Sequence, residues 1–472
     1  MNEIKRPGTG QQALLGETDL TALRGNIRGS LLTANDPGYD EARKIWNAMV
    51  DRRPAAILRA LGAADVIQAV RFAKAHQLPL AVRGGGHNIA GNAVCDQGLM
   101  LDLSAMKSVR VNPSTRRAVV EPGATLADVD RETQAFGLVV PTGINSTTGI
   151  AGLTLGGGFG WTTRKFGMTI DNLLSVDLVT ADGTLVHASE TENSDLFWAV
   201  RGGGGNFGVV TAFEFALHPL GPQVISGLLV HPFDQAATLL KSYRRLVASA
   251  PDELTCWCVM RKAPPLPFIP QEWHGREVLV FALCYAGPMA EGEKAAAPFR
   301  ALGKPIADVV GPHPFVGWQA AFDPLLTPGA RNYWKSHDFV ELSDGAIDAV
   351  LAGVANLPGP ECEIFIAHVG GAMAKVKSDA TAYPQRQSHF IMNVHTRWHE
   401  ASQDAACIGW ARKLSTATAP HAAGSVYVNF MPEDETDRVS QAYGRNYPRL
   451  AAIKRRFDPE NLFRLNQNIR PS

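Results

Sequence analysis

The sequence predicts an α+β protein of two domains, and three observations carry this prediction. Up to about residue 215, short strand-like runs alternate with helical patterns and are interrupted by glycine clusters. After Pro219 the strand-like runs become longer and indicate an antiparallel sheet. The chain has 472 residues, whereas a typical domain has about 100–200. We therefore expect a domain boundary near Gly221.

In the first half, helices are expected where apolar residues recur every three or four positions, and strands where apolar runs are short or alternate. Val66, Val70 and Ala73 define the first helix, and Gly137 ends a later one. The turn 181–183 between two apolar runs predicts a hairpin. Helices are expected over residues 63–76, 126–136 and 192–200, and strands over residues 78–82, 98–103, 109–111, 117–122, 174–180, 184–188 and 209–215.

The second half is expected to form a sheet of longer strands with two helices. The proline-rich segment 262–270 predicts a loop between two of the strands, because each proline removes a backbone donor. Strands are expected over residues 224–230, 253–260, 277–285, 363–369 and 389–397, and helices over residues 289–301 and 343–355.

The composition excludes several classes of function. Lys+Arg and Asp+Glu both number 45, so the chain lacks the basic character of a nucleic-acid-binding protein. No apolar run is long enough to cross a bilayer, and residues 1–7 lack the apolar core of a secretory signal. The six scattered cysteines favour free thiols, and no H-E-x-x-H zinc motif occurs. We expect a cytoplasmic protein, monomeric or homodimeric, without a metal site or a membrane partner.

Glycine clusters at residues 84–86, 156–158 and 202–205 each follow an apolar run. Consecutive glycines let backbone N–H groups converge on an anion such as a phosphate, although tight turns are the alternative interpretation. One shared anionic ligand explains three clusters more economically than three unrelated turns. His87 directly follows the first cluster, and a neutral imidazole is a competent nucleophile. Gly203, Gly205 and Gly208 match G-x-G-x-x-G, but a strand-like run follows them, which excludes a Rossmann site.

Several separate motifs together resemble the berberine bridge enzyme-like flavoproteins of the vanillyl-alcohol-oxidase superfamily. The resemblance extends from about residue 35 to the C-terminus. It rests on residues 83–88, 141–160, 198–211, 427–430 and the final stretch 449–469. It implies a PCMH-type FAD-binding domain formed by residues 1–220 and 426–472, with a substrate domain, residues 221–425, whose antiparallel sheet covers the flavin.

The resemblance also implies how FAD is held. His87 occupies the position of the histidine that is tethered to the flavin ring, and Arg83 supports the loop. In many members a cysteine forms a second tether, but Asn145 stands there, and Leu153 replaces a frequent histidine. One covalent bond is therefore expected, as in singly tethered bacterial members such as hydroxynicotine oxidase. The implied cofactor-binding residues are Arg83, Gly84, Gly85, Gly86, His87, Asn88, Gly91, Gly143, Thr147, Thr148, Gly149, Gly152, Leu153, Gly156, Gly157, Gly158, Gly208, Val210 and Asn429.

A catalytic base must lie within hydrogen-bond reach of the substrate. Alternation along strand 389–397 places Asn393 and His395 on one face, and the resemblance adds Tyr427, which we expect to share a face with Asn429. A structural histidine and a core tyrosine are the alternatives. Asn429 is expected to orient the flavin or the substrate. Residues 331–335, with Tyr333 and Trp334, are a further candidate wall of the pocket, or else pack between the domains.

The expected activity is an FAD-dependent oxidase. It would remove hydride from a C–H next to an alcohol or amine of a small organic substrate, with O2 as acceptor and H2O2 as product. The resemblance implies that Thr148 controls the access of oxygen. The alternatives are a dehydrogenase of the same fold with another electron acceptor, a non-catalytic flavin-binding protein, and an NAD(P)H-dependent reductase.

Overall fold

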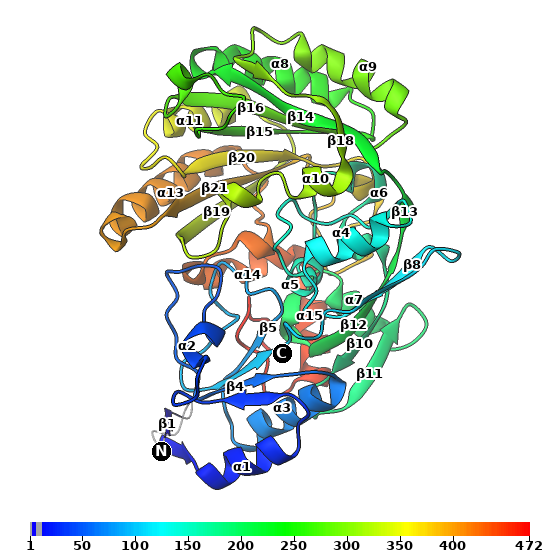
Figure 1. Cartoon of the computed structure of the whole chain (residues 1–472), viewed down its shortest axis with the longest axis vertical. Helices are drawn as coiled ribbons and strands as arrows, with labels where there is room; N and C mark the ends of the chain where they lie inside the picture. Colours follow the sequence, from blue (N-terminus) through cyan, green and yellow to red (C-terminus); the bar gives the residue numbers. More distant parts are fainter. Residues whose placement is uncertain (1, 6–11) are drawn as a thin grey trace.

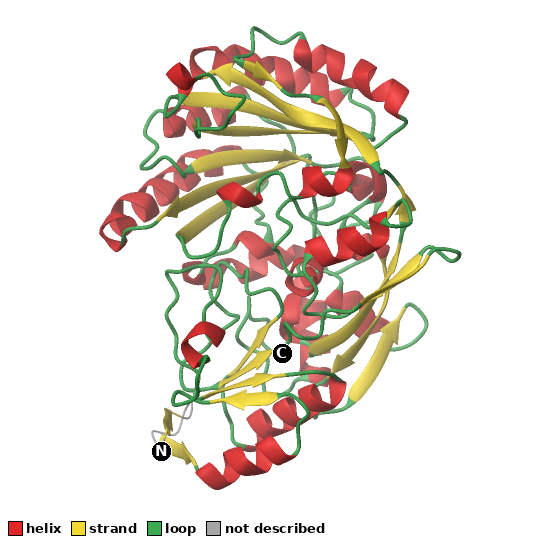
Figure 2. Cartoon of the chain, viewed as in Figure 1, coloured by secondary structure: helices red, strands yellow, loops and turns green. Residues whose placement is uncertain are grey.

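The computed structural model describes residues 2–5 and 12–472 and combines helices with several sheets, as predicted (Figure 2). Met1 and residues 6–11, which belong to the N-terminal segment considered above, lie outside the described residues. None of the helices in the described ranges is both long and apolar enough to pass through a bilayer. The six cysteines are free and buried.

The first half of the chain forms a mixed sheet and an antiparallel sheet, which share helix α3 (Ala63–Ala75). Val66, Val70 and Ala73 of α3 are buried in one core with residues of both sheets, as their spacing predicted. The mixed sheet has the order β3 (Ser30–Leu32), β4 (Ala56–Arg59), β6 (Leu99–Asp102), β5 (Leu80–Arg83), and β4, β6 and β5 are parallel. The antiparallel sheet has the order β11 (Leu185–Ser189), β10 (Leu173–Val179), β12 (Val209–Ala216), β8 (Arg117–Val120), β7 (Val109–Asn112), which includes the predicted hairpin.

The second half forms a larger antiparallel sheet, which we call the roof sheet (Figure 1). Its strands follow the order β17 (Ala307–Asp308), β14 (Gln223–Pro232), β16 (Glu277–Tyr285), β15 (Leu254–Lys262), β20 (Glu363–His368), β21 (Phe390–Trp398), β19 (Arg331–Phe339), and β18 (Gly311–Pro314) also pairs with β14. Helices α8 (Ala236–Ala248), α9 (Met289–Arg300), α11 (Asp344–Val354) and α13 (Asp404–Thr418) cover its outer face. Cys256 and Cys258 point to these helices, so the alternating Trp257 and Val259 point to the inner face.

The C-terminal segment returns to the first half of the chain (Figure 1). Helices α14 (Val439–Tyr443) and α15 (Tyr447–Phe457) pack in the same core as α7 (Ser194–Val200). The fully buried Lys454 ammonium donates to Asp458 Oδ2 (2.6 Å) and to the carbonyls of Asn206 (2.7 Å) and Phe463 (3.0 Å). This lysine therefore fixes the final residues against the loop that precedes β12.

Some elements were not expected from the sequence. Examples are β4, β19, α8, α13 and α15. In residues 427–430, Val428–Phe430 form a 3-10 turn instead of an alternating strand. Helix α4 (Leu126–Gln134) begins at a capping box of Thr125 and Asp128, which stabilises such a helix by about 1 kcal/mol. The remaining elements are β1 (Asn2–Lys5), β2 (Gln12–Leu15), α1 (Glu17–Gly25), α2 (Tyr39–Ala42), β9 (Leu138–Val139), α5 (Ile150–Leu155), α6 (Thr163–Phe166), β13 (His218–Pro219), α10 (Phe315–Gln319), α12 (Ala372–Lys375) and further short 3-10 turns.

Candidate active site

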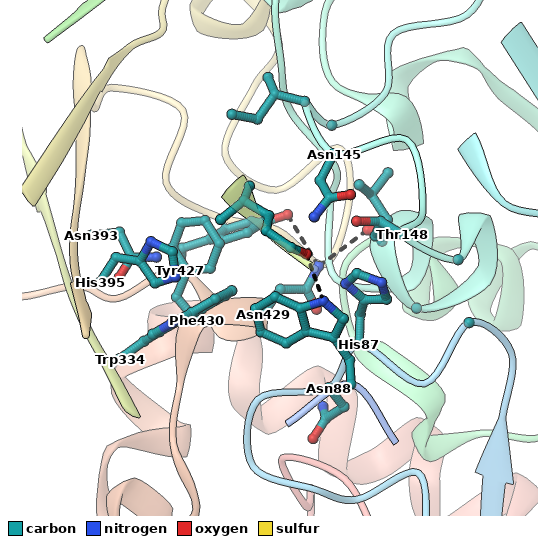
Figure 3. A pocket seen from close by; sticks show the side chains of 18 of the residues that line it. His87, Asn88, Asn145, Thr148, Trp334, Asn393, His395, Tyr427, Asn429 and Phe430 are labelled. Carbon is teal, nitrogen blue, oxygen red and sulfur yellow. Dashed lines mark hydrogen bonds between the residues drawn. The ribbon is translucent and has the colours of Figure 1, made fainter. Parts of the chain in front are cut away.

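A cavity of about 370 Å³ lies between the glycine loops of the first half and the inner face of the roof sheet. Residues 463 and 465–467 of the C-terminal segment complete its wall. Figure 3 shows His87 and Asn145 on one side, His395 and Asn393 on the other, and Tyr427, Asn429 and Phe430 between them. Residues more than 300 positions apart in the sequence therefore meet in one space. We call it the central cavity.

The first glycine loop packs directly against the segment that precedes α5. A Cβ on Gly85 would lie 2.4 Å from the backbone nitrogen of Gly149, so both positions exclude any side chain. Arg83 supports the loop from below: its guanidinium binds both carboxylate oxygens of Asp102 (3.1 and 2.6 Å) and the carbonyl of Ala42. No acceptor among residues 2–5 and 12–472 takes a hydrogen bond from the backbone N–H groups of residues 85–88. These groups remain available to an anion.

A short hydrogen-bond relay fixes the tautomer of His87. The N–H and the hydroxyl of Thr147 both donate to Asn145 Oδ1 (3.1 and 2.8 Å). The Thr147 hydroxyl has only one hydrogen, so Oγ1 accepts from His87 Nε2, 3.1 Å away. Nε2 therefore carries the imidazole hydrogen, and Nδ1 keeps its lone pair. Burial lowers the pKa of His87 to about 4, so the imidazole is neutral at pH 7.

Aromatic rings connect His87 with the roof sheet. The His87 ring stacks on Trp46, with centroids 5.1 Å apart, and Trp46 meets Trp334 edge-on at 5.7 Å. Trp334 in turn lies perpendicular to His395, with centroids 4.8 Å apart. Trp334 thus lines the cavity, which is one of the two alternatives for residues 331–335. Tyr333 does not line it, because its hydroxyl donates to Asp434 outside the cavity.

Tyr427 and Asn429 lie together, although the 3-10 turn and not a strand brings them there. Tyr427 Oη accepts from the Gly158 N–H (2.9 Å) and from Asn429 Nδ2 (3.1 Å). A Cβ on Gly156 would lie 2.2 Å from Asn429 Oδ1, so this glycine makes room for the amide. Burial raises the pKa of Tyr427 to about 12, so the phenol keeps its proton at neutral pH.

His395 belongs to a buried polar group on neighbouring strands of the roof sheet. Glu363 on β20 lies opposite His395 on β21 and opposite Arg261 on β15. Glu363 accepts from His395 Nδ1 (3.0 Å) and from an Arg261 N–H (2.6 Å). Burial alone would raise the pKa of Glu363, but Arg261 and His395 outweigh burial and lower it to about 2. The side chain is therefore a carboxylate that holds the Nδ1–H tautomer of His395.

His395 and its neighbour Asn393 both have buried polar atoms without a hydrogen-bond partner. Among the described residues, no atom forms a hydrogen bond with Nε2 of His395 or with either amide atom of Asn393. Both residues line the central cavity and lie on the face of β21 that alternation predicted. Unpaired polar atoms at 0–3% exposure are costly unless a ligand group satisfies them. His395 Nε2 is thus a proton acceptor that faces the cavity.

The structure brings most of the predicted site residues to the central cavity. Those that line it are Gly84, Gly85, Gly86, His87, Asn88, Gly143, Thr148, Gly149, Gly152, Leu153, Gly208, Val210, Asn393, His395, Tyr427 and Asn429. Those that lie behind its surface are Arg83, Gly91, Thr147, Gly156, Gly157 and Gly158. The cluster 156–158 thus supports Tyr427 and Asn429, while Gly204 and Gly205 of the third cluster reach the cavity.

Sequence reasoning missed Glu363, Arg261 and Trp46. Glu363 begins a predicted strand, but its pairing with His395 depends on the strand order β15-β20-β21, which no local pattern encodes. Trp46 lies in an irregular segment before β4, where nothing in the sequence indicates a ring stacked on His87.

The residues present fit FAD. Open space lies where a Cβ would stand on Gly152 and Gly205, so the cavity wall is bare backbone there. Leu80, Val82 and Leu103 give the same cavity an apolar wall. The buried Oδ1 of Asn466, another lining residue, has no partner within the part of the chain that the structure describes. Free backbone donors, bare glycine backbone and an apolar wall suit a pyrophosphate joined to aromatic rings.

Comparison with known proteins agrees with this fit. A family profile described as an FAD binding domain matches residues 54–189, and one described as "berberine and berberine like" matches residues 426–470. An uncharacterised FAD-linked oxidoreductase of Bacillus subtilis is 31% identical, and the alignment covers 94% of this chain and 97% of that protein. The protein is thus an FAD-linked oxidoreductase.

More specifically, the chain belongs to the berberine bridge enzyme-like family of the vanillyl-alcohol-oxidase superfamily. (R)-6-hydroxynicotine oxidase of Paenarthrobacter nicotinovorans is 30% identical over 94% of this chain and 97% of its own. The crystal structure of 6-hydroxy-D-nicotine oxidase from Arthrobacter nicotinovorans matches with a TM-score of 0.85 at 28% identity and covers 94% of this chain and 98% of that one. Berberine bridge enzyme from Eschscholzia californica shares the fold, with a TM-score of 0.84 at 21% identity over 96% and 99% of the two chains.

Proposed function

We propose that the protein is an FAD-dependent oxidase that removes hydride from a C–H next to an alcohol or amine and passes the electrons to O2. Its FAD-binding part would comprise residues 1–220 and 426–472, and its substrate-binding part residues 221–425. One observation carries the proposal: an imidazole with an unpaired Nε2, held by a buried carboxylate, shares a cavity with the glycine loops and His87.

His395 is the proposed base. In its neutral form the Nδ1–H donates to Glu363, so Nε2 presents a lone pair to the substrate O–H or N–H. The Glu363 carboxylate then stabilises the imidazolium, as the aspartate does in a Ser-His-Asp triad. Tyr427 is a poorer candidate, because its phenol retains the proton and its oxygen already accepts two hydrogen bonds. Asn393 supplies an amide donor and an acceptor that orient the same substrate group.

The reaction balances with oxygen as the acceptor. With FAD bound, the substrate would give one proton to His395 and one hydride to the flavin. A C=O or C=N bond would thereby form in the substrate. Dioxygen takes the two electrons and two protons and becomes hydrogen peroxide. The cofactor supplies the hydride-accepting ring, while this chain positions the substrate and accepts its proton.

We also propose that His87 carries the cofactor covalently through Nδ1, with no second tether. The Asn145–Thr147 relay leaves the Nδ1 lone pair free, and Asn145 offers no thiol for a further bond. With FAD bound, a C–N bond at Nδ1 would replace a C–H of the flavin ring system, and the imidazole would release its Nε2–H. Dioxygen would take these two hydrogens with their electrons as hydrogen peroxide.

The base is tested by anaerobic mixing of the holoenzyme with secondary alcohols and cyclic amines. His395→Gln should slow flavin bleaching at least about 10²-fold, the usual contribution of a general base. His399→Gln is the matched control, because His399 is largely exposed and pairs with Glu361. Equal bleaching rates in wild type and His395→Gln would remove His395 from the mechanism.

Reoxidation by air tests whether O2 is the electron acceptor, and acid denaturation tests the covalent bond at His87. Admitting air to the bleached enzyme should restore the flavin within seconds and release one peroxide per flavin, whereas reoxidation over minutes indicates a dehydrogenase. The flavin should stay with the chain in acid precipitation, and His87→Ala should release it. Freely extractable wild-type flavin would refute the covalent bond. The cytoplasmic location and the oligomeric state stay predictions.

A further inference from the structure

The central cavity extends along the roof sheet well past the polar group at His395. Neighbouring strands place inner-face residues in cross-strand rows, and one row begins at Asn393 on β21. Next in this row come Phe365, Val259, Val280 and Val230 on β20, β15, β16 and β14. These four side chains are all apolar, and all line the cavity.

A second apolar row runs beside the first. Trp257 on β15 lies opposite Ala282 on β16, which lies opposite Leu228 on β14. These residues also line the cavity. Two adjacent rows thus form an apolar surface on the inner face of the roof sheet. This surface starts beside Asn393 and His395 and ends at β14. We call this part of the cavity the apolar arm.

The proline-rich loop closes the far end of the apolar arm. Leu266 and Phe268 of this loop line the cavity and are half-buried against the cluster of Val230, Val278 and Val280. The loop has a defined shape, because the Ile269 N–H donates to the Leu266 carbonyl (3.0 Å) and the Gly275 N–H to that of Ala263 (2.9 Å). It is a built wall and not an incidental surface segment.

The dimensions and polarity of the arm define a class of ligand. Four interstrand spacings of about 4.8 Å separate β21 from β14, which gives a reach of about 19 Å. Apart from the indole N–H of Trp257, the side chains of the two rows offer only hydrocarbon, so sugar hydroxyls placed there would lose most of their hydrogen bonds to water. An alkyl or aryl group would lose nothing and would gain apolar contact.

We propose that the substrate is amphipathic, with the oxidisable hydroxyl or amine at one end and an extended apolar group at the other. The polar end binds at Asn393 and His395, and the apolar group lies over Val259 and Val280 and under Phe268. The inference rests on the proposed oxidase function for the role of the polar end. The apolar arm itself depends only on the cavity, so binding tests it separately from turnover.

The test measures binding of 1-alkanols from butanol to decanol, and of cellobiose, to the anaerobic holoenzyme. Dissociation constants come from perturbation of the flavin absorption spectrum and from the ligand-induced rise in Tm. Affinity should increase about fourfold for each added methylene, the factor that corresponds to about 0.8 kcal/mol per buried CH2, until the arm is filled. Cellobiose should bind more weakly than octanol. Affinity that does not depend on chain length, or tighter binding of cellobiose, would overturn the proposal.

Two variants locate the binding region. Phe268→Ala should weaken octanol about tenfold and leave butanol within twofold, whereas Phe136→Ala, at a half-exposed phenylalanine on the first half, should change neither. Val280→Thr keeps the side-chain shape but adds a hydroxyl within the apolar row, and it should likewise weaken only the longer alkanols. Equal effects on butanol and octanol in both variants would refute the arm.

The outcomes separate this inference from the proposed function. If affinity depends on chain length but no alcohol or amine bleaches the flavin, the apolar arm is supported and the oxidase function fails. If only sugars bleach the flavin and alkanols bind without chain-length dependence, the oxidase function stands and the apolar arm is refuted.

Discussion

Replacing Glu363 by glutamine tests whether the carboxylate governs proton transfer at His395. The surroundings of Glu363 lower its pKa from 4.5 to about 2, which corresponds to roughly 3 kcal/mol in favour of the carboxylate. Arg261 contributes most to this lowering and His395 contributes next, so Glu363 stays a carboxylate and can stabilise the imidazolium that forms at His395 during the reaction. Loss of a positioned general base typically costs about 10²–10⁴-fold in rate. Glutamine can also donate an N–H to Nδ1, which would move the imidazole hydrogen to Nε2 and abolish the base.

The assay is the rate of anaerobic flavin bleaching at saturating substrate, followed by stopped-flow absorbance across pH 5–9. Glu363→Gln should reduce the limiting rate at least about 10²-fold. Glu361→Gln is the matched control, since Glu361 pairs with Arg397 and His399 and does not line the central cavity. A limiting rate within threefold of wild type would refute the reasoning.

Three further predictions concern the cofactor and stability. Thr147→Val removes the partner of His87 Nε2 and should lower the covalently bound fraction of flavin, measured by acid precipitation, while FAD still binds; an unchanged fraction would show that the relay is unimportant. Burial raises the pKa of Asp130 to about 7, so the native protein holds a proton that the unfolded chain releases above about pH 4, and stability should fall as pH rises from 4 to 7. Asp130→Asn should therefore raise the free energy of unfolding at pH 8 by up to about 4 kcal/mol, seen as a higher Tm, and should hardly change the Tm at pH 4. Equal Tm shifts at both pH values would contradict this linkage. Lys454→Met leaves the Asp458 carboxylate buried without its ion-pair partner and should lower the free energy of unfolding by about 3–5 kcal/mol. A lower Tm and a lower flavin content after gel filtration should result. An unchanged Tm and flavin content would show that the pair is dispensable.

Local sequence patterns were sufficient for most of the fold. Helix α3 and the hairpin of β10 and β11 formed where apolar spacing and the turn 181–183 predicted them. The strand β12 follows the third glycine cluster, in agreement with the strand predicted over residues 209–215. Strand β19 was missed because its residues, such as Lys335 and Asp338, are polar although buried, and the partners that satisfy them come from distant segments.

The parts of the site that lie within one continuous segment could be predicted from sequence motifs. The glycine loop and His87 follow from one continuous segment, and the face shared by Asn393 and His395 follows from alternation. The contact between His395 and Glu363 depends on which strand lies next to β21, and that is decided by packing of the whole roof sheet. Glycines 156–158 illustrate the opposite case, because a motif shared with a family marks them while the structure places them behind the cavity surface.

The course of the C-terminal segment has a consequence for cofactor retention. Residues 463 and 465–467 form part of the cavity wall, and Lys454 fastens them to the loop before β12. A chain that ends before residue 463 therefore lacks this wall and presents open glycine loops. We expect a variant truncated at that point to retain little FAD after purification.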